Sequence, residues 1–484
     1  MSKRPNILLV TTDQQRADCL GISDSRHPVM TPHLDQLASE GVRFTRAYSD
    51  CPLCIPSRTT IMTGKAAYTH GVATNGEYLI PEAPELTLPG RLRHAGYQTH
   101  AAGKMHFIPP RNRNGFERMR LVPEDYVNFL ETTDYRGLYR GHGLGGNEVY
   151  PTFSAVPTRY SATHWTVNES IEFLRQRDTE TPFFMWTSFE APHPPYDPPE
   201  SYVRLYDGVD IPQPAMAEWA EEEQLPTWVR YRRRSHKLDH LPQHVIALAR
   251  KHYYAQITHI DYELGRLFGE MKSQGIWNDT LVIFTSDHGE MLGDHGLFHK
   301  TCFYESSANV PFLLKPPLGA EGSLTPSTVI STPIALADIY PTALHYADLL
   351  DPSDGARDGR SLLDLHNLER ERPWLYGFMN EWDGLYMITN GEWKYVYYVL
   401  GGNEQLFYLP DDPAECRSML ETPEGRLQLP LMRRLLAERF PNLLASGCGE
   451  AAAFIRVEAE VPAEQLTVSN PFAWRGPIRY GGHW

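Results

Sequence analysis

The residues from Cys51 to Gly64 place a thiol, a proline and an arginine at spacings that suit chemistry on an anion. Pro56 fits the first turn of a helix, because its fixed φ suits that turn and its missing N–H would be unpaired there, and Gly64 is a natural stop. Cys54 would lie at the helix N-terminus, which favours an anion and lowers the pKa of a thiol. Arg58 returns to the same face four residues later and can hold an oxyanion. The alternative is a structural helix with a buried cysteine and a surface arginine.

Acidic residues follow two short apolar runs that lie far apart in the sequence. Residues 6–12 predict a buried strand ending at Asp13, and residues 280–286 predict another that leads into Asp287 and His288. Open α/β sheets bind ligands at the carboxyl ends of their strands, so these side chains are candidate metal ligands. Two carboxylates and an imidazole suit a hard to borderline divalent cation, with calcium first and manganese or magnesium behind it. The alternative for Asp13 is a helix N-cap.

Basic and amide side chains follow other predicted elements. Lys104 and His106 come after a predicted strand at 98–102, and side chains two apart on an extended segment point to the same side, so both can reach one anion. An exposed lysine and a hydrogen-bonded histidine are the alternative. Asn75, in a polar turn, could reach the same anion or serve only the turn.

Four separated motifs occur in an order that is typical of one enzyme family. Cys-x-Pro-Ser-Arg at 54–58, followed by Thr-Thr-x-x-Thr-Gly at 59–64, resembles the signature of the type I, formylglycine-dependent sulfatases of the alkaline phosphatase superfamily. Gly-Lys-x-His at 103–106, His193, and Asp-His-Gly-Glu at 287–290 with the later Lys300 are similar to further sulfatase motifs.

The resemblance implies hydrolysis of a sulfate monoester to an alcohol and inorganic sulfate. A sulfatase-maturing enzyme would oxidise Cys54 to formylglycine, and not Cys51, because Pro56 and Arg58 stand at the family spacing from Cys54 only. The aldehyde would hydrate, and one hydroxyl, lying on the metal, would attack sulfur and displace the alcohol. The second hydroxyl would then lose its proton, which re-forms the aldehyde and expels sulfate. The implied site residues are Cys54, Arg58, Lys104, His106, His193 and Lys300 for catalysis, Asn75 and Gln14 for substrate binding, and Asp13, Asp287, His288 and Cys54 for one metal ion.

The same resemblance implies individual roles. Arg58, Lys104 and Lys300 would offset charge on the sulfuryl oxygens. His193 or Lys300 would protonate the leaving oxygen, and His106 would position the diol. One metal ion takes few protein ligands, so the other polar residues after 287 are expected to stabilise turns or to contact the metal ligands without binding the metal: Glu290, Asp294, His295 and His299.

This chain departs from the common sulfatase pattern at two positions. Many sulfatases have a second Asp where this chain has Gln14, and Asn where it has His288, which weakens the case for calcium and brings manganese closer. One alternative is a phosphonate monoester or phosphodiester hydrolase of the same superfamily, and another is an inactive sulfatase-like binding protein. The first uses a metal site like Asp13, Gln14, Asp287 and His288 but, as a family, lacks Lys104 and His106; the second would be expected to have lost a metal ligand or Cys54.

The order of the predicted elements indicates an α/β fold with a smaller C-terminal antiparallel sheet plus helix. The resemblance implies that the large sheet is mixed, mostly parallel and flanked by helices, as in alkaline phosphatase. We expect a catalytic domain at 1–365, a small α+β domain at 366–460 and a tail at 461–484 that is packed or forms an oligomer arm. Irregular stretches are predicted at 109–157, over the site mouth as a specificity element, and at 203–244. Helices are predicted at 86–95, 162–177, 245–274, 332–349 and 425–440.

Composition limits the partners and the location. Lys and Arg number 45 against 60 Asp and Glu, a net charge of −15, which argues against a nucleic-acid or anionic membrane surface. The longest apolar runs are too short for a membrane span or a signal sequence, so we expect a cytoplasmic enzyme. The six cysteines form no regular framework, and the lone CxxC of Cys51 and Cys54 leaves a redox or zinc role as an alternative.

The sequence favours a small, imported sulfate ester over a polysaccharide. Trp382 beside Asp383 could hold a cationic alcohol, stack on a sugar or simply pack. A homo-oligomer is one alternative for the assembly, and aryl, choline and sugar sulfates are the alternatives for the ester.

Overall fold

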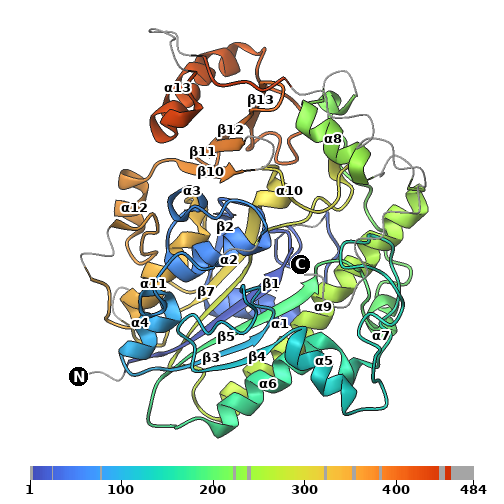
Figure 1. The fold of residues 1–484 in the computed structure, drawn as a ribbon, viewed down its shortest axis with the longest axis vertical. Coiled ribbons are helices and arrows are strands. Elements are labelled where there is room, and N and C mark those ends of the chain that lie inside the picture. Colours follow the sequence, from blue (N-terminus) through green and yellow to red (C-terminus); the bar gives the residue numbers. More distant parts are fainter. Residues whose placement is uncertain are drawn as a thin grey trace.

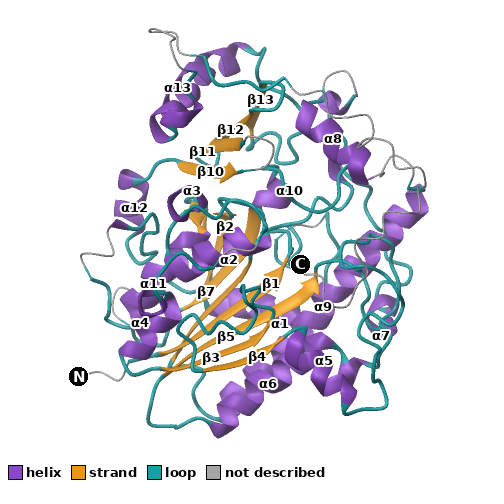
Figure 2. Cartoon of the chain, in the orientation of Figure 1, coloured by secondary structure: helices purple, strands orange, loops and turns teal. Residues whose placement is uncertain are grey.

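The computed structural model describes residues 4–23, 26–76, 79–221, 225–236, 241–320, 324–351, 356–380, 384–445 and 453–458. This part of the chain folds around a large mixed sheet with helices on both faces, and a smaller antiparallel sheet lies beyond one end of it (Figure 1 and Figure 2). The predicted α/β class with a smaller C-terminal sheet is therefore confirmed.

The larger sheet is mostly parallel. Its strands in the described residues are β1 (Asn6–Asp13), β2 (Val42–Tyr48), β3 (Gln98–Gly103), β4 (Arg118–Leu121), β5 (Phe183–Pro192), β6 (Thr280–Ser286), β7 (Asn309–Lys315), β8 (Thr328–Ile330) and β9 (Ile334–Ala335). They lie in the order β4-β3-β5-β1-β6-β7-β2-β8, with β9 paired to β2 and with β7 antiparallel to both of its neighbours. Central β1 pairs in parallel with β5 and β6, so the carboxyl ends of these three strands meet at one edge.

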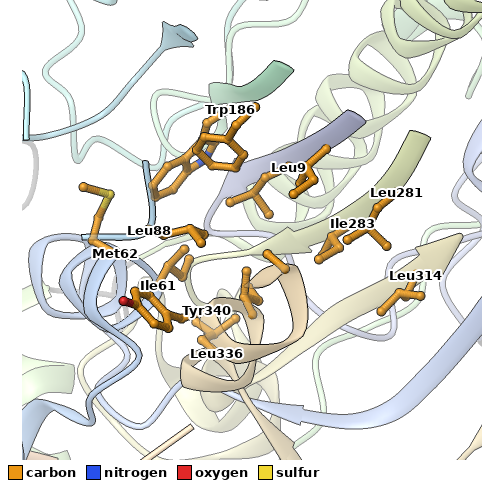
Figure 3. Packing of buried hydrophobic residues seen from close by; sticks show 14 of the residues in the cluster. Leu9, Ile61, Met62, Leu88, Trp186, Leu281, Ile283, Leu314, Leu336 and Tyr340 are labelled. Carbon is orange, nitrogen blue, oxygen red and sulfur yellow. The ribbon is translucent and has the colours of Figure 1, made fainter. Parts of the chain in front are cut away.

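Side chains of β1 alternate between two cores. Ile7 and Leu9 face one core, and Leu8 and Val10 face the other. Because both faces of the strand are covered, its sequence is a continuous apolar run. Figure 3 shows the first core, where residues of the sheet meet side chains from the helices and loops that cover it: Leu9, Trp186, Leu281, Ile283 and Leu314 with Ile61, Met62, Leu88, Leu336 and Tyr340.

Different helices cover the two faces. The first core contains residues of α2 (Cys54–Thr63), α4 (Leu88–His94) and α11 (Ile339–Tyr346). The second contains residues of α1 (Pro32–Glu40), α6 (Ala162–Gln176) and α9 (Gln243–Ser273). The remaining α-helices of the described residues are α3 (Ala67–His70), α5 (Glu124–Glu131), α7 (Glu200–Arg204), α8 (Thr227–His236), α10 (Glu305–Ala308), α12 (Leu365–Glu371) and α13 (Pro423–Arg439).

The smaller sheet is antiparallel throughout, with strands β10 (Leu375–Met379), β11 (Leu385–Thr389), β12 (Trp393–Tyr398) and β13 (Asn403–Tyr408). Helix α13, predicted at 425–440, packs on one face through Met432 and Leu436. On the opposite side, the buried ammonium of Lys394 lies 2.7 Å from Glu305 of α10 and 2.8 Å from Glu415. The domain boundaries stay predictions, and the tail at 461–484 lies outside the described residues.

Three expectations need correction. The stretch predicted as one helix at 332–349 contains β9, whose Ile334 pairs with β2, before α11 begins. The stretch predicted as irregular at 109–157 contains β4 and α5, and the stretch at 203–244 contains α8 and the last residues of α7. These short elements are held by neighbouring parts of the fold, which periodicity along the chain does not detect.

The residues named above as a site for the alcohol group, Trp382 and Asp383, lie outside the described residues. Within the described ranges, every helix is too short or too polar to cross a membrane.

Candidate functional site

Helix α2 places Cys54 at its first residue. The preceding Leu53 is extended, Pro56 occupies the first turn, and Gly64 ends the helix at φ 65°, donating its N–H to Thr60 at 2.8 Å. The thiol is 1% exposed. Burial and Asp13 would raise its pKa, but Lys300, His288 and Lys104 outweigh them and hold the pKa of Cys54 well below its usual value.

Asp13, Cys54, Asp287 and His288 form one buried cluster. Their ligand atoms all lie within 4.8 Å of one another. Asp13 ends β1, while Asp287 and His288 follow the adjacent parallel strand β6. Cys54 Sγ lies 3.2 Å from His288 Nε2 and 3.7 Å from Asp13 Oδ1. The structure therefore brings together the four residues predicted as metal ligands.

The donor set of this cluster fits a divalent cation. His288 Nδ1 lies 3.0 Å from the carbonyl of Gly289 and donates to it, so the lone pair of Nε2 faces the carboxylates. Burial and the nearby Asp13 raise the pKa of Asp287, as expected for two carboxyl groups that share one buried site. A bound cation would offset this repulsion, because buried charges in proteins are paired or coordinate metals.

Two cations flank the cluster. Arg58 lies on the same face of α2 as Cys54, and its Nη2 is 2.9 Å from Asp287 Oδ2. Lys104, directly after β3, places Nζ 2.6 Å from Asp13 Oδ2. Burial alone would raise the pKa of Asp13, but the positive charges of Lys104 and Arg58 hold it well below its usual value.

Sequence reasoning missed Ser188, which fixes the positions of these two cations. Its hydroxyl, in β5, accepts from Arg58 Nη1 at 2.8 Å and donates to the Lys104 carbonyl at 2.6 Å. The same carbonyl accepts from Arg58 Nη1 at 2.5 Å. A serine inside a buried strand carries no signal of this role in the sequence, because the partners come from other elements.

Lys300 and His193 form a second polar group of the site. Lys300 Nζ is 3.0 Å from His193 Nε2 and 2.6 Å from Gln14 Oε1. His193 Nδ1 lies 2.7 Å from the carbonyl of Pro194, which can only accept, so the imidazole proton is on Nδ1 and Nε2 accepts from Lys300. Burial, Lys300 and Lys104 hold the pKa of His193 well below its usual value, so the ring is neutral at pH 7.

Gln14 connects Lys300 to the outer polar groups. Its Nε2 donates to Glu290, which also accepts from the backbone N–H groups of Leu292 at 2.8 Å and His299 at 2.5 Å. Gln14 itself has φ 74°, an uncommon value outside glycine, and it is held by its N–H to Asp287 at 3.1 Å. Glu290 thus accepts hydrogen bonds from the loop and from Gln14, in line with the prediction that it does not bind the metal.

Two predicted residues lie differently from the rest. Asn75 is exposed, and its Oδ1 accepts from the N–H of Ile55 at 3.1 Å, so it contacts the first turn of α2 next to Cys54. His106 is half-buried at φ 58°, two residues beyond Lys104. Contact of Asn75 with substrate and of His106 with the diol stay predictions.

Asp18, Cys19 and His27 also bring potential ligand atoms within 4.8 Å of one another. Arg16 binds both oxygens of Asp18 at 2.7 Å, and it reaches Asp294 at 2.7 Å as well. The Asp18 carboxylate is therefore already paired with a buried guanidinium, and this group is a structural ion network.

Comparisons with known proteins agree with the residues described above. A family model described as Sulfatase matches residues 5–349, and one described as N-sulphoglucosamine sulphohydrolase, C-terminal, matches residues 293–440. The arylsulfatase of Clostridium perfringens (strain 13 / Type A) is 34% identical over 464 residues, which cover 90% of this chain and 94% of the relative. The choline-sulfatase of Rhizobium meliloti (strain 1021) is 32% identical over 440 residues, which cover 87% and 83%.

Similar solved structures include a phosphonate monoester hydrolase from Agrobacterium radiobacter. It is 27% identical, with a TM-score of 0.74 over 94% of this chain and 100% of that one. The similarity supports the predicted alkaline-phosphatase-like architecture. Sulfatases and a phosphonate hydrolase are thus both among the proteins that this chain resembles.

Proposed function

This chain belongs to the sulfatase family. On that premise we propose that it hydrolyses a sulfate monoester to an alcohol and inorganic sulfate, with residue 54 as the source of the nucleophile. The observation that carries the proposal is the convergence of Cys54 with the Asp13, Asp287 and His288 side chains, flanked by cations. A sulfuryl group at this place would meet a nucleophile, a metal site and positive charge together.

The family implies formylglycine at Cys54, and we propose that a sulfatase-maturing enzyme converts this residue. The hydrated aldehyde supplies one hydroxyl that attacks sulfur and a second whose deprotonation releases sulfate. The Cys-x-Pro-Ser-Arg pattern supports the conversion of Cys54 over Cys51. In the folded chain the residue is 1% exposed and lies among cations and carboxylates.

The family also implies a metal ion, which Asp13, Asp287, His288 and residue 54 would hold. When bound, the cation lowers the pKa of a hydroxyl and so supplies a nucleophile at neutral pH. We propose calcium, because oxygen donors outnumber the single imidazole; manganese is the competing ion.

Removal of the divalent ion is expected to abolish turnover and to lower the melting temperature. An ion at about 100 to 1,000 times its Kd adds about 3 to 4 kcal/mol to the free energy of unfolding, because it binds only the folded cluster. Calorimetry and initial rates before and after chelation, followed by addition of calcium or manganese, measure both effects. Asp287→Asn is the matched control, whose melting temperature should respond less to the ion. Full activity in a chelated, metal-free sample would refute the metal proposal.

We propose that Arg58 and Lys104 bind the non-bridging oxygens of the sulfuryl group and offset their charge. Lys300 is the proposed proton donor to the leaving oxygen, and His193 its positioning partner. This choice follows from the hydrogen bond of His193 Nδ1 to Pro194 O, which leaves the histidine without a proton on the nitrogen that faces Lys300.

A phosphonate monoester hydrolase is the second candidate, favoured by the structural similarity and by Gln14 and His288 in the metal segments. A sulfate monoester offers three non-bridging oxygens, whereas a phosphonate monoester replaces one with carbon. A buried donor that faces carbon stays unpaired at a cost of about 1 to 3 kcal/mol. Lys104 and His106 would therefore disfavour the phosphonate.

For an aryl sulfate, kcat/KM should exceed that for the matched aryl phosphonate by roughly ten- to ten-thousand-fold. The ratio should shrink when Lys104 and His106 are both replaced by small neutral residues. Initial rates on the two substrates provide the test. A preference of the unmodified chain for the phosphonate would assign it to the second candidate.

The remaining partners are proposed on the sequence alone. We propose a small sulfate ester as substrate and a maturing enzyme as protein partner. The cytoplasmic location and a homo-oligomer stay predictions.

A further inference from the structure

A pocket lies beside His193. The end of β5, the loop after it as far as Pro199, and helix α9 form part of its wall, and residues between Tyr126 and Thr163 form the rest. Much of that segment is the stretch predicted to lie over the site mouth. Because His193 Nε2 is 3.0 Å from Lys300 Nζ, an ester oxygen within reach of Lys300 would place its alcohol toward this pocket.

The negative charge of the first carboxylate in the pocket, Glu190, is offset by the guanidinium of Arg140. Glu190 is 2.8 Å from Arg140 Nη2, and it accepts from the hydroxyl of Tyr139 at 3.1 Å. The guanidinium of Arg140 also lies over the Tyr139 ring, 5.1 Å from its centroid. The charges of Glu190 and Arg140 therefore cancel in this part of the pocket.

The second carboxylate, Asp197, has two uncharged side-chain donors. His142 Nε2 lies 2.9 Å away, and Gln256 Nε2 lies 3.3 Å away. His142 Nδ1 accepts from the backbone N–H of Leu144 at 3.1 Å, so the imidazole proton is on Nε2 and the ring is neutral.

Asp197 therefore gives the pocket a net negative charge. Its side chain is 28% exposed, more than those of Glu190 at 19% and Arg140 at 13%, so it is the charge that a ligand reaches most readily. Burial raises the pKa of Asp197, while the hydrogen bond from His142 and the charge of Arg140 act in the opposite direction.

We propose that this pocket selects sulfate esters of alcohols that carry an ammonium group, and that Asp197 binds that group. The inference rests on the sulfatase function proposed above and names its substrate class. An ammonium group gains the attraction of an uncompensated carboxylate, whereas a neutral alcohol gains little and an anionic one is repelled.

The test compares 2-aminoethyl sulfate with propyl sulfate, which match in length and differ in charge. With the matured full chain, kcat/KM should favour the amino ester by about ten- to a hundredfold, the usual range for a hydrogen bond to a charged group. The preference should fall as salt is added, because Asp197 is partly exposed. Equal rates for the two esters would overturn the inference without any variant.

A substitution at Asp197 tests whether this residue causes the preference for the amino ester. Asp197→Asn should bring the ratio of the two kcat/KM values to within about threefold, since most of the attraction is charge. Glu169→Gln, which removes a carboxylate paired with Arg120 at 2.7 Å outside this pocket, should leave the ratio as it is. A ratio that survives Asp197→Asn would overturn the role of Asp197.

The two levels of the proposal fail in different ways. If an aryl sulfate and propyl sulfate are hydrolysed but the amino ester has no advantage, only the substrate class is wrong. If the matured chain hydrolyses no sulfate ester of the three, the proposed function fails and the substrate class with it.

Discussion

Replacement of Cys54 by alanine is expected to lower kcat/KM for an aryl sulfate by about four to six orders of magnitude. Loss of a nucleophile has effects of this size in enzymes whose chemistry depends on one covalent step. The side chain also belongs to the cluster proposed to hold the metal ion, with Sγ 3.2 Å from His288 Nε2. Initial rates with matured protein measure the loss.

Cys51→Ala is the matched control for this prediction. Cys51 is equally buried but packs in a hydrophobic cluster, with Sγ 3.6 Å from the carbonyl of Ala73. Its loss should cost stability and leave turnover within a few-fold, since it contributes nothing to the reacting group. If Cys54→Ala kept a tenth of the activity, or if Cys51→Ala abolished it in a folded protein, the assignment of the nucleophile would be wrong.

The second large effect concerns Lys300. Lys300→Met keeps the length of the side chain but removes the proposed proton donor. It should lower kcat/KM for an alkyl sulfate by about 10²- to 10⁴-fold, the range for general acid catalysis. An aryl sulfate with an acidic phenol should lose much less, because its leaving group departs without a proton.

Lys104→Met separates this role from a general loss of positive charge. Lys104 lies 2.6 Å from Asp13 and is proposed to act on the sulfuryl oxygens, so its loss should affect alkyl and aryl esters alike. Rates across a series of leaving groups with different pKa values measure the dependence for both variants. If Lys300→Met slowed all esters equally, Lys300 would not be the proton donor.

The convergence of Asp13, Asp287 and Cys54 could be predicted from the sequence. Asp13 and Asp287 directly follow apolar runs, and parallel neighbouring strands must bring such ends together. The Pro56 and Gly64 signals fix α2 and hence the position of Cys54. These predictions hold because each depends on a local pattern and on one rule of sheet topology.

The pairing of side chains could not be predicted in this way. Lys300 could equally have contacted an acid; its contacts with Gln14 and His193 depend on how a loop after β6 folds against β1 and β5. Ser188 joins Arg58 to Lys104 only because β5 lies between the two parallel neighbours β1 and β3. Such contacts arise from tertiary packing, which leaves no periodic signal along the chain.

Elements with weak patterns also escaped prediction. Helix α8 lies in a charged stretch, where Trp228 is fully buried and donates to the Thr301 carbonyl at 3.0 Å. The run 332–349 reads as one helix, but Ile334 completes an edge of the larger sheet. In both places long-range contacts override the local preference of the sequence.

Mass spectrometry of the peptide from Cys51 to Arg58, taken from fully active protein, tests the central claim most directly. We predict that residue 54 carries the mass of an aldehyde in place of its thiol, that Cys51 is unmodified, and that turnover rises in proportion to the converted fraction. An unmodified thiol at position 54 in fully active protein would contradict the account.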